Sequence, residues 1–241
     1  MTVDLRGLPA VLLPGTGSDD DYVSRAFSDP LHRAGVELVA PRPQPRQLVE
    51  GYLTALDSAA GHHAAIIVGG VSIGAAVAVA WALRHPDQTV AVLAALPAWT
   101  GPAGDAPAAQ AARYSAQQLR SDGLAASVAQ LHASSPSWLA AELTRSWTSQ
   151  WPHLPEAMEA AAGYPGPTAA ELGTLAAPLG VAAATDDPIH PLPVAAQWVA
   201  AAPAAGLRTV TLAQIGAEPS ALGSACLAAL ADAAPGLQSP G

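Results

Sequence analysis

The chain has 241 residues, of which 51% are hydrophobic and only 12% are charged. This composition predicts a packed globular protein and excludes a disordered chain. The net charge is −9 and the ten basic residues form no cluster, so we expect no nucleic-acid partner.

The only cysteine is Cys226, which excludes a disulfide within the chain and a zinc site of the Cys-rich kind. We expect no metal and no cofactor. The apolar stretches are too short to cross a membrane, and the first residues do not resemble a signal peptide, so we expect a cytoplasmic protein without a membrane partner. Abundant alanine and the absence of lysine indicate a bacterial source with a GC-rich genome, and a homodimer is compatible with the sequence.

The first part of the chain alternates short apolar runs with helical patterns. Residues 10–13 predict a buried strand, and the loop Pro14–Gly17 leads into a helix that we expect Ser18 to cap. A strand over 36–40 and a helix over 47–60 follow. This alternation predicts a parallel sheet with right-handed crossovers.

The next strand and helix enclose a serine. The apolar run 64–68 precedes Gly70-Val71-Ser72-Ile73-Gly74, and a second apolar run over 75–83 follows it. Gly-x-Ser-x-Gly between a strand and a helix is typical of a nucleophile elbow, although the pentapeptide also arises by chance in chains rich in glycine. We therefore expect Ser72 to be a nucleophile.

An oxyanion hole is expected beside this serine. The backbone N–H of Ile73 would stand at a helix N-terminus, where N–H groups lack intrahelical partners. A second N–H, from Thr16 or Gly17, would complete the hole. Gly15 and Gly17 would allow close approach of a substrate, although an ordinary strand-to-helix turn also explains this loop.

After a strand over 89–96 the alternation stops. Residues 97–176 contain helical patterns but no convincing strand, and they hold four of the six tryptophans. We interpret this segment as a helical insertion over the carboxyl edge of the sheet. Trp99, Trp138 and Trp147 would line a substrate pocket, and the alternative is that the tryptophans only pack helices together.

The strand pattern resumes at 179–184 and ends in Thr185-Asp186-Asp187-Pro188-Ile189-His190. A helix over 194–202, a strand over 207–212 and a helix over 219–233 complete the chain. Ligands of open parallel sheets bind beyond the carboxyl ends of the strands. Asp187 and His190 are therefore expected at the same edge as Ser72.

This arrangement resembles the α/β-hydrolase superfamily. The resemblance implies a sheet of about six mostly parallel strands with helices on both faces. It divides the chain into a core over 1–96, a helical lid insertion over 97–176 and the rest of the core over 177–241. Ser72 then matches the nucleophile, Pro14–Gly17 replaces the oxyanion loop, and Asp187 resembles the acid.

One position departs from the family pattern. The family places its histidine after the last strand, where this chain has Ala217, and no histidine follows His190. Serine is a poor nucleophile without an adjacent base. His190 is the best replacement because Asp187 could orient it, whereas His132 and His153 in the insertion are weaker alternatives.

Three hypotheses of function remain open. The first is serine-dependent hydrolysis or acyl transfer on a small apolar ester or thioester. The second is a lyase or cyclase of specialised metabolism that uses the same pocket without an acyl-enzyme. The third is a catalytically decayed ligand-binding protein, which the alanine at position 217 motivates.

Overall fold

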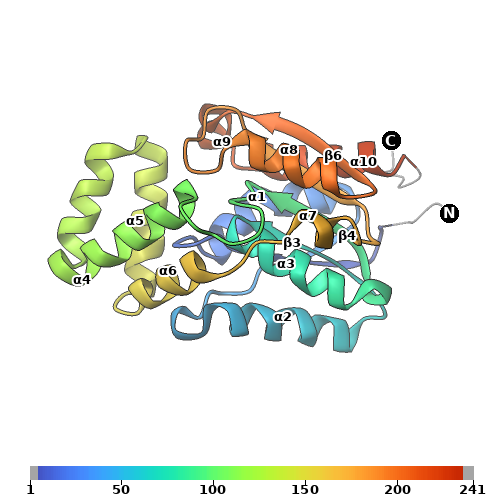
Figure 1. The fold of residues 1–241 in the computed structure, drawn as a ribbon, viewed down its shortest axis with the longest axis horizontal. Coiled ribbons are helices and arrows are strands. Elements are labelled where there is room, and N and C mark those ends of the chain that lie inside the picture. Colours follow the sequence, from blue (N-terminus) through green and yellow to red (C-terminus); the bar gives the residue numbers. More distant parts are fainter. Residues whose placement is uncertain (1–4, 236–241) are drawn as a thin grey trace.

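The computed structural model describes residues 5–235, which fold around one central sheet (Figure 1). Its strands are β1 (Pro9–Leu13), β2 (Glu37–Val39), β3 (Ile66–Val71), β4 (Thr89–Ala95), β5 (Leu179–Ala184) and β6 (Ala205–Val210). They lie in the order β2-β1-β3-β4-β5-β6, and every neighbouring pair is parallel. The parallel sheet predicted from the alternating pattern is confirmed, and so are the about six strands that the family resemblance implied.

Helices cover both faces of the sheet. One face packs against α2 (Leu48–His62), α3 (Ile73–Arg84) and α8 (Leu192–Ala201), and the other against α1 (Asp20–Arg33) and α10 (Ser220–Ala233). All residues of β1, β3 and β5 are buried, whereas the edge strands β2 and β6 are partly exposed. Burial on both faces explains why the inner strands are continuous apolar runs rather than alternating ones.

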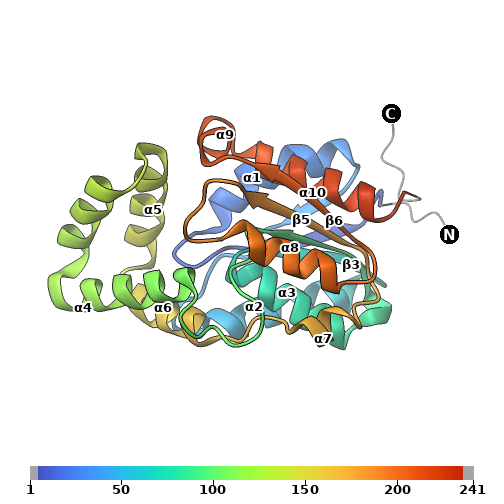
Figure 2. The same ribbon diagram turned by 45° about the horizontal axis from the view of Figure 1, so that its top comes forward.

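The chain between β4 and β5 forms four helices and, among the described residues, no strand. They are α4 (Pro107–Ser134), α5 (Ser137–Gln150), α6 (Leu154–Gly163) and α7 (Ala169–Leu172). Figures 1 and 2 show α4, α5 and α6 beyond one end of the sheet. They share a core of their own around Leu119, Trp147 and Met158. We call residues 97–176 the helical insert.

Helix α4 is not continuous. It spans 28 residues, but Gly123 has φ 79° and ψ 173°, which separates two helical halves. None of the helices within residues 5–235 combines the length and the apolar character that a membrane crossing requires.

The cap of α1 and the segment after β6 differ from the sequence predictions. Helix α1 is capped by Asp19 rather than Ser18, and the Asp19 carboxylate accepts the N–H of Tyr22 at 3.0 Å. A carboxylate suits this position because it also interacts with the positive end of the helix dipole. The segment after β6 forms an unpredicted short helix, α9 (Leu212–Ala217), which begins with a capping box between Thr211 and Gln214.

Close packing of α10 on β5 generates a prediction about stability. A Cβ atom at Gly180 would lie 2.4 Å from the carbonyl oxygen of Cys226 and 2.7 Å from the backbone nitrogen of Leu230. We expect Gly180→Ala to lower the free energy of unfolding by about 2 kcal/mol or more, because backbone atoms must move apart. Gly61→Ala is the matched control, since a Cβ there meets nothing within 4 Å. Urea denaturation of the two variants measures the difference, and equal stability would contradict the packing described.

Candidate active site

Ser72 occupies a strained turn between β3 and α3. Its φ of 54° and ψ of −115° lie outside the regions that non-glycine residues favour. The flanking glycines permit this turn, because a Cβ at Gly70 or Gly74 would lie 2.4 or 2.3 Å from the carbonyl oxygen of Leu13. The end of β1 therefore packs directly against the turn. The result is a serine presented at the carboxyl edge of the sheet and at the N-terminus of α3.

The imidazole of His190 lies beside this serine. Its Nε2 is 3.0 Å from Ser72 Oγ, and its Nδ1 is 2.8 Å from Asp187 Oδ2. Both distances are within hydrogen-bonding range. With the proton on Nδ1, the ring donates to Asp187 and accepts from the serine hydroxyl. The structure thus brings together the three residues that the sequence nominated, in the order serine, histidine, aspartate.

Asp187 and His190 lie in one short turn, and the backbone of this turn holds the Asp187 carboxylate. Its Oδ1 accepts the N–H of Ile189 at 2.7 Å and that of His190 at 3.2 Å, while Oδ2 faces the His190 ring. Although burial opposes the charged form, the His190 ring and these backbone N–H groups hold the pKa of Asp187 below its usual value. The carboxylate is therefore charged and fixed, as an orienting acid must be.

The neighbouring carboxylate serves a different part of the fold. Asp186 Oδ1 accepts the N–H of Leu212 at 2.8 Å, at the start of α9. Adjacent side chains thus diverge, one toward His190 and one toward the helix that ends at Ala217. Because α9 fills the segment after β6, the place of the family histidine is occupied by a short capped helix.

Several other histidines contact groups away from Ser72. In the insert, His132 Nε2 lies 3.0 Å from Thr144 Oγ1, and His153 Nδ1 lies 3.3 Å from Glu156 Oε1. His85 stacks on Trp81 with ring centroids 4.1 Å apart. Of the candidates weighed from the sequence, His190 is the one that the structure places against the serine.

The loop after β1 adjoins the serine from the other side. A Cβ at Gly15 would lie 3.6 Å from Ser72 Cβ, so this loop passes close to Ser72. The N–H of Ile73 belongs to the first residue of α3 and has no intrahelical partner. The loop after β1 and the first residue of α3 therefore both adjoin Ser72.

The three tryptophans nominated as substrate-binding residues lie in different surroundings. Trp147 is buried against Gly17, where a Cβ would lie 2.7 Å from its Nε1. Trp138 packs on Gly216 of α9, where a Cβ would lie 2.3 Å from its Cδ1. Trp99 is buried in the core of the insert, and its Nε1 donates to the carbonyl oxygen of Tyr164 at 3.2 Å. Trp147 is the one that adjoins the loop beside Ser72.

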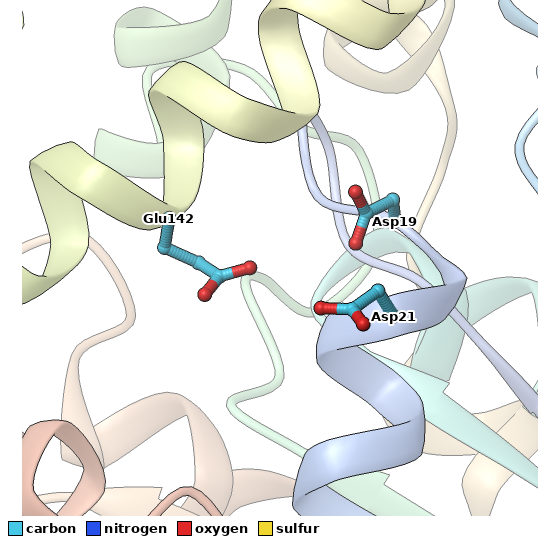
Figure 3. A group of neighbouring side chains, drawn as sticks. All are labelled: Asp19, Asp21 and Glu142. Carbon is cyan, nitrogen blue, oxygen red and sulfur yellow. The ribbon is translucent and has the colours of Figure 1, made fainter.

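Three carboxylates also converge at the edge of the insert. Figure 3 shows Glu142 of α5 reaching toward Asp19 and Asp21 at the start of α1. Arg145 pairs with all three of them, and Arg25 pairs with Asp21 and Glu142. The two guanidinium groups supply the positive charge that such a cluster needs. Sequence reasoning did not find this network, because its partners are more than a hundred residues apart.

Comparisons with known proteins identify the fold. No family model and no curated protein matches the sequence. Among solved structures, a hydrolase from Oleispira antarctica is similar with a TM-score of 0.71 and 13% identity, covering 92% of this chain and 89% of that one. A carboxylesterase structure from Nitrososphaera gargenis gives 0.68 and 15%, covering 87% and 83%. The enol-lactonase from Burkholderia xenovorans LB400 gives 0.63 and 17%, covering 86% and 83%.

These likenesses extend over most of each chain and agree with the fold described above. The parallel sheet and the helices on both of its faces are those that the sequence resemblance implied. The chain has the α/β-hydrolase fold.

Proposed function

We propose that this protein is a serine-dependent hydrolase or acyl-transfer enzyme acting on a small apolar ester or thioester. The observation that carries the proposal is the 3.0 Å contact between His190 Nε2 and Ser72 Oγ. It supplies the base that the sequence lacks at its usual place. The carboxylesterase and enol-lactonase named above support the same reaction class, since both share this fold.

Acylation follows from the geometry. Ser72 Oγ attacks the carbonyl carbon while its proton passes to His190 Nε2, and Asp187 stabilises the resulting imidazolium. Negative charge develops on the carbonyl oxygen, which accepts hydrogen bonds from the N–H groups of Ile73 and Thr16. Collapse of the tetrahedral intermediate breaks the ester bond, and His190 returns the proton to the leaving alcohol or thiol.

Deacylation repeats these steps with water in place of the serine. His190 removes a proton from the attacking water, and the second tetrahedral intermediate expels Ser72 Oγ, which recovers its proton. Another alcohol or thiol in place of water gives acyl transfer. The reaction balances without a metal or a cofactor.

The surroundings of the loop after β1 favour an apolar substrate. Trp147 and Met158 both contact Gly17, so the insert presents hydrophobic side chains toward the serine edge. In this proposal residues 97–176 act as a lid, and Trp147 contributes to the acyl or leaving-group pocket. Gly15 allows the substrate to approach the backbone beside Ser72, whereas Trp147 covers Gly17, and Trp99 and Trp138 would complete the lining of the pocket.

Labelling and activity of active-site variants separate covalent catalysis from the two alternative functions. A fluorophosphonate should label wild-type protein at Ser72, and Ser72→Ala or His190→Gln should lower kcat on p-nitrophenyl butyrate by a factor of about 10⁴ or more. His132→Gln is the matched control and should retain wild-type activity, because His132 pairs within the insert. Mass spectrometry locates the label.

Other outcomes favour other functions. A modest loss in Ser72→Ala would favour a lyase or cyclase that only binds substrate with this hydroxyl. Tight binding of an ester without turnover or labelling would favour a ligand-binding protein.

The charge of Asp187 generates a prediction about the pH dependence of stability. The charged Asp187 is stabilised by folding, so its contribution to stability is complete above the ordinary carboxyl pKa of 3.8 and is lost as pH falls through the lowered folded value. Asp187→Asn keeps an acceptor for the N–H groups of Ile189 and His190 but removes the charge. We expect the gap in Tm between wild type and this variant to shrink below about pH 4. Thermal melts across a pH series test this, and a gap independent of pH would contradict it.

A further inference from the structure

We propose that helix α5 of the insert positions the oxyanion loop, with Arg145 and Gln150 as positioning residues for catalysis. The inference rests on the proposed function, because it assigns these residues a role in the oxyanion hole of that reaction. Three side chains of α5 reach three consecutive residues that follow Thr16. They are Trp147 on Gly17, Gln150 on Ser18 and Arg145 on Asp19.

Arg145 provides the strongest of these contacts. Its two terminal nitrogens donate to the two oxygens of Asp19 at 2.6 and 3.0 Å, which is a forked ion pair. Asp19 is 5% exposed and also caps α1 through the N–H of Tyr22. Loss of Arg145 would leave this buried carboxylate without its charge partner, so its position would change.

Gln150 fixes the backbone of the same loop. Its Nε2 donates to the carbonyl oxygen of Ser18 at 2.9 Å and to Ser146 Oγ at 2.8 Å. The side chain is 7% exposed, so water does not compete freely for these partners. The contact therefore sets the orientation of the peptide group between Ser18 and Asp19.

Trp147 is the third side chain of α5 that contacts this loop, and it packs against Gly17. Gly17 has a φ of 69°, and a Cβ there would lie 2.7 Å from Trp147 Nε1 and 3.4 Å from Met158 Cε. Only glycine combines this backbone conformation with so close an indole. The loop is thus confined by side chains of the insert on one side and by Ser72 on the other.

The ion pairs of the acidic cluster hold α5 in one position against α1. Glu142 accepts from both Arg25 and Arg145, and Arg25 also pairs with Asp21. Each guanidinium contacts α1 and α5 together, so neither helix can shift without breaking an ion pair. A displacement of α5 would move Asp19 and, through Ser18 and Gly17, the N–H of Thr16.

Variants of this contact provide the test. We expect Arg145→Gln to lower kcat on p-nitrophenyl butyrate and the rate of fluorophosphonate labelling about tenfold or more, with KM within about twofold, because oxyanion donors act in the transition state. Asp19→Asn keeps the cap on α1 and should show a similar loss. The double variant should lose little beyond either single one, because the two residues act through one contact.

Arg120→Gln is the matched control. Arg120 forms a forked ion pair with Glu159 inside the insert, with distances of 3.0 and 2.7 Å, and it does not touch the loop. We expect this variant to keep wild-type kcat and labelling rate. Tm values of all variants show whether the protein is folded, and Asp19→Asn decides the matter if Arg145→Gln does not fold.

The outcomes separate the two proposals. Labelled wild type together with wild-type rates in Arg145→Gln and Asp19→Asn would overturn the positioning role alone. A rise in KM with unchanged kcat would also overturn it, since that pattern indicates a substrate-binding role. Wild-type protein that resists labelling would overturn the proposed function and this inference with it.

Discussion

The contact between Ser72 and His190 depends on the register of three parallel strands. Val71 of β3 is paired with Ala95 of β4, and Ala95 is paired with Ala182 of β5. Backbone hydrogen bonds continue this register past the strand ends, from Ser72 N–H to Ala95 at 2.9 Å and from Leu96 N–H to Ala182 at 2.7 Å. The pairing of these strands therefore fixes the serine and the turn that carries His190 relative to each other.

A histidine three residues after its aspartate has consequences for the rest of the chain. In the proposed mechanism, the turn from Asp187 to His190 supplies both the acid and the base, so the segment after β6 need not present a catalytic residue. That segment forms α9, whose first N–H, from Leu212, donates to Asp186 and on which Trp138 of α5 packs. Residues of the insert thus contact both the loop after β1 and the segment after β6, across the full width of the serine edge.

Sequence reasoning reaches the parts of the fold that depend on local pattern. Continuous apolar runs predicted the buried strands, and glycines at 70 and 74 predicted the turn at Ser72, because close approach requires them. His190 could be nominated because the sequence has no later histidine and an aspartate three residues earlier.

Other features depend on partners distant in the sequence. Asp19 caps α1 in place of Ser18 and simultaneously binds Arg145, 126 residues away. No periodicity or spacing indicates such a pair, since the charges belong to helices that meet only after the sheet has formed. Helix α9 had a local signal, the capping box from Thr211 to Gln214, but its six residues are too few for a helical period to show.

The energetic costs within the described residues gather at one edge of the molecule. Ser72 and Leu96 are the two non-glycine residues with positive φ in the described part of the chain, and they directly follow the adjacent strands β3 and β4. Three buried side-chain polar atoms of the described chain lack partners, and two of them belong to Ser18 and Trp147. Each such feature costs about 1–3 kcal/mol. A stability optimum would spread or remove these costs, so their concentration near Ser72 fits the proposed catalytic role of this edge and the proposed role of α5 in maintaining it.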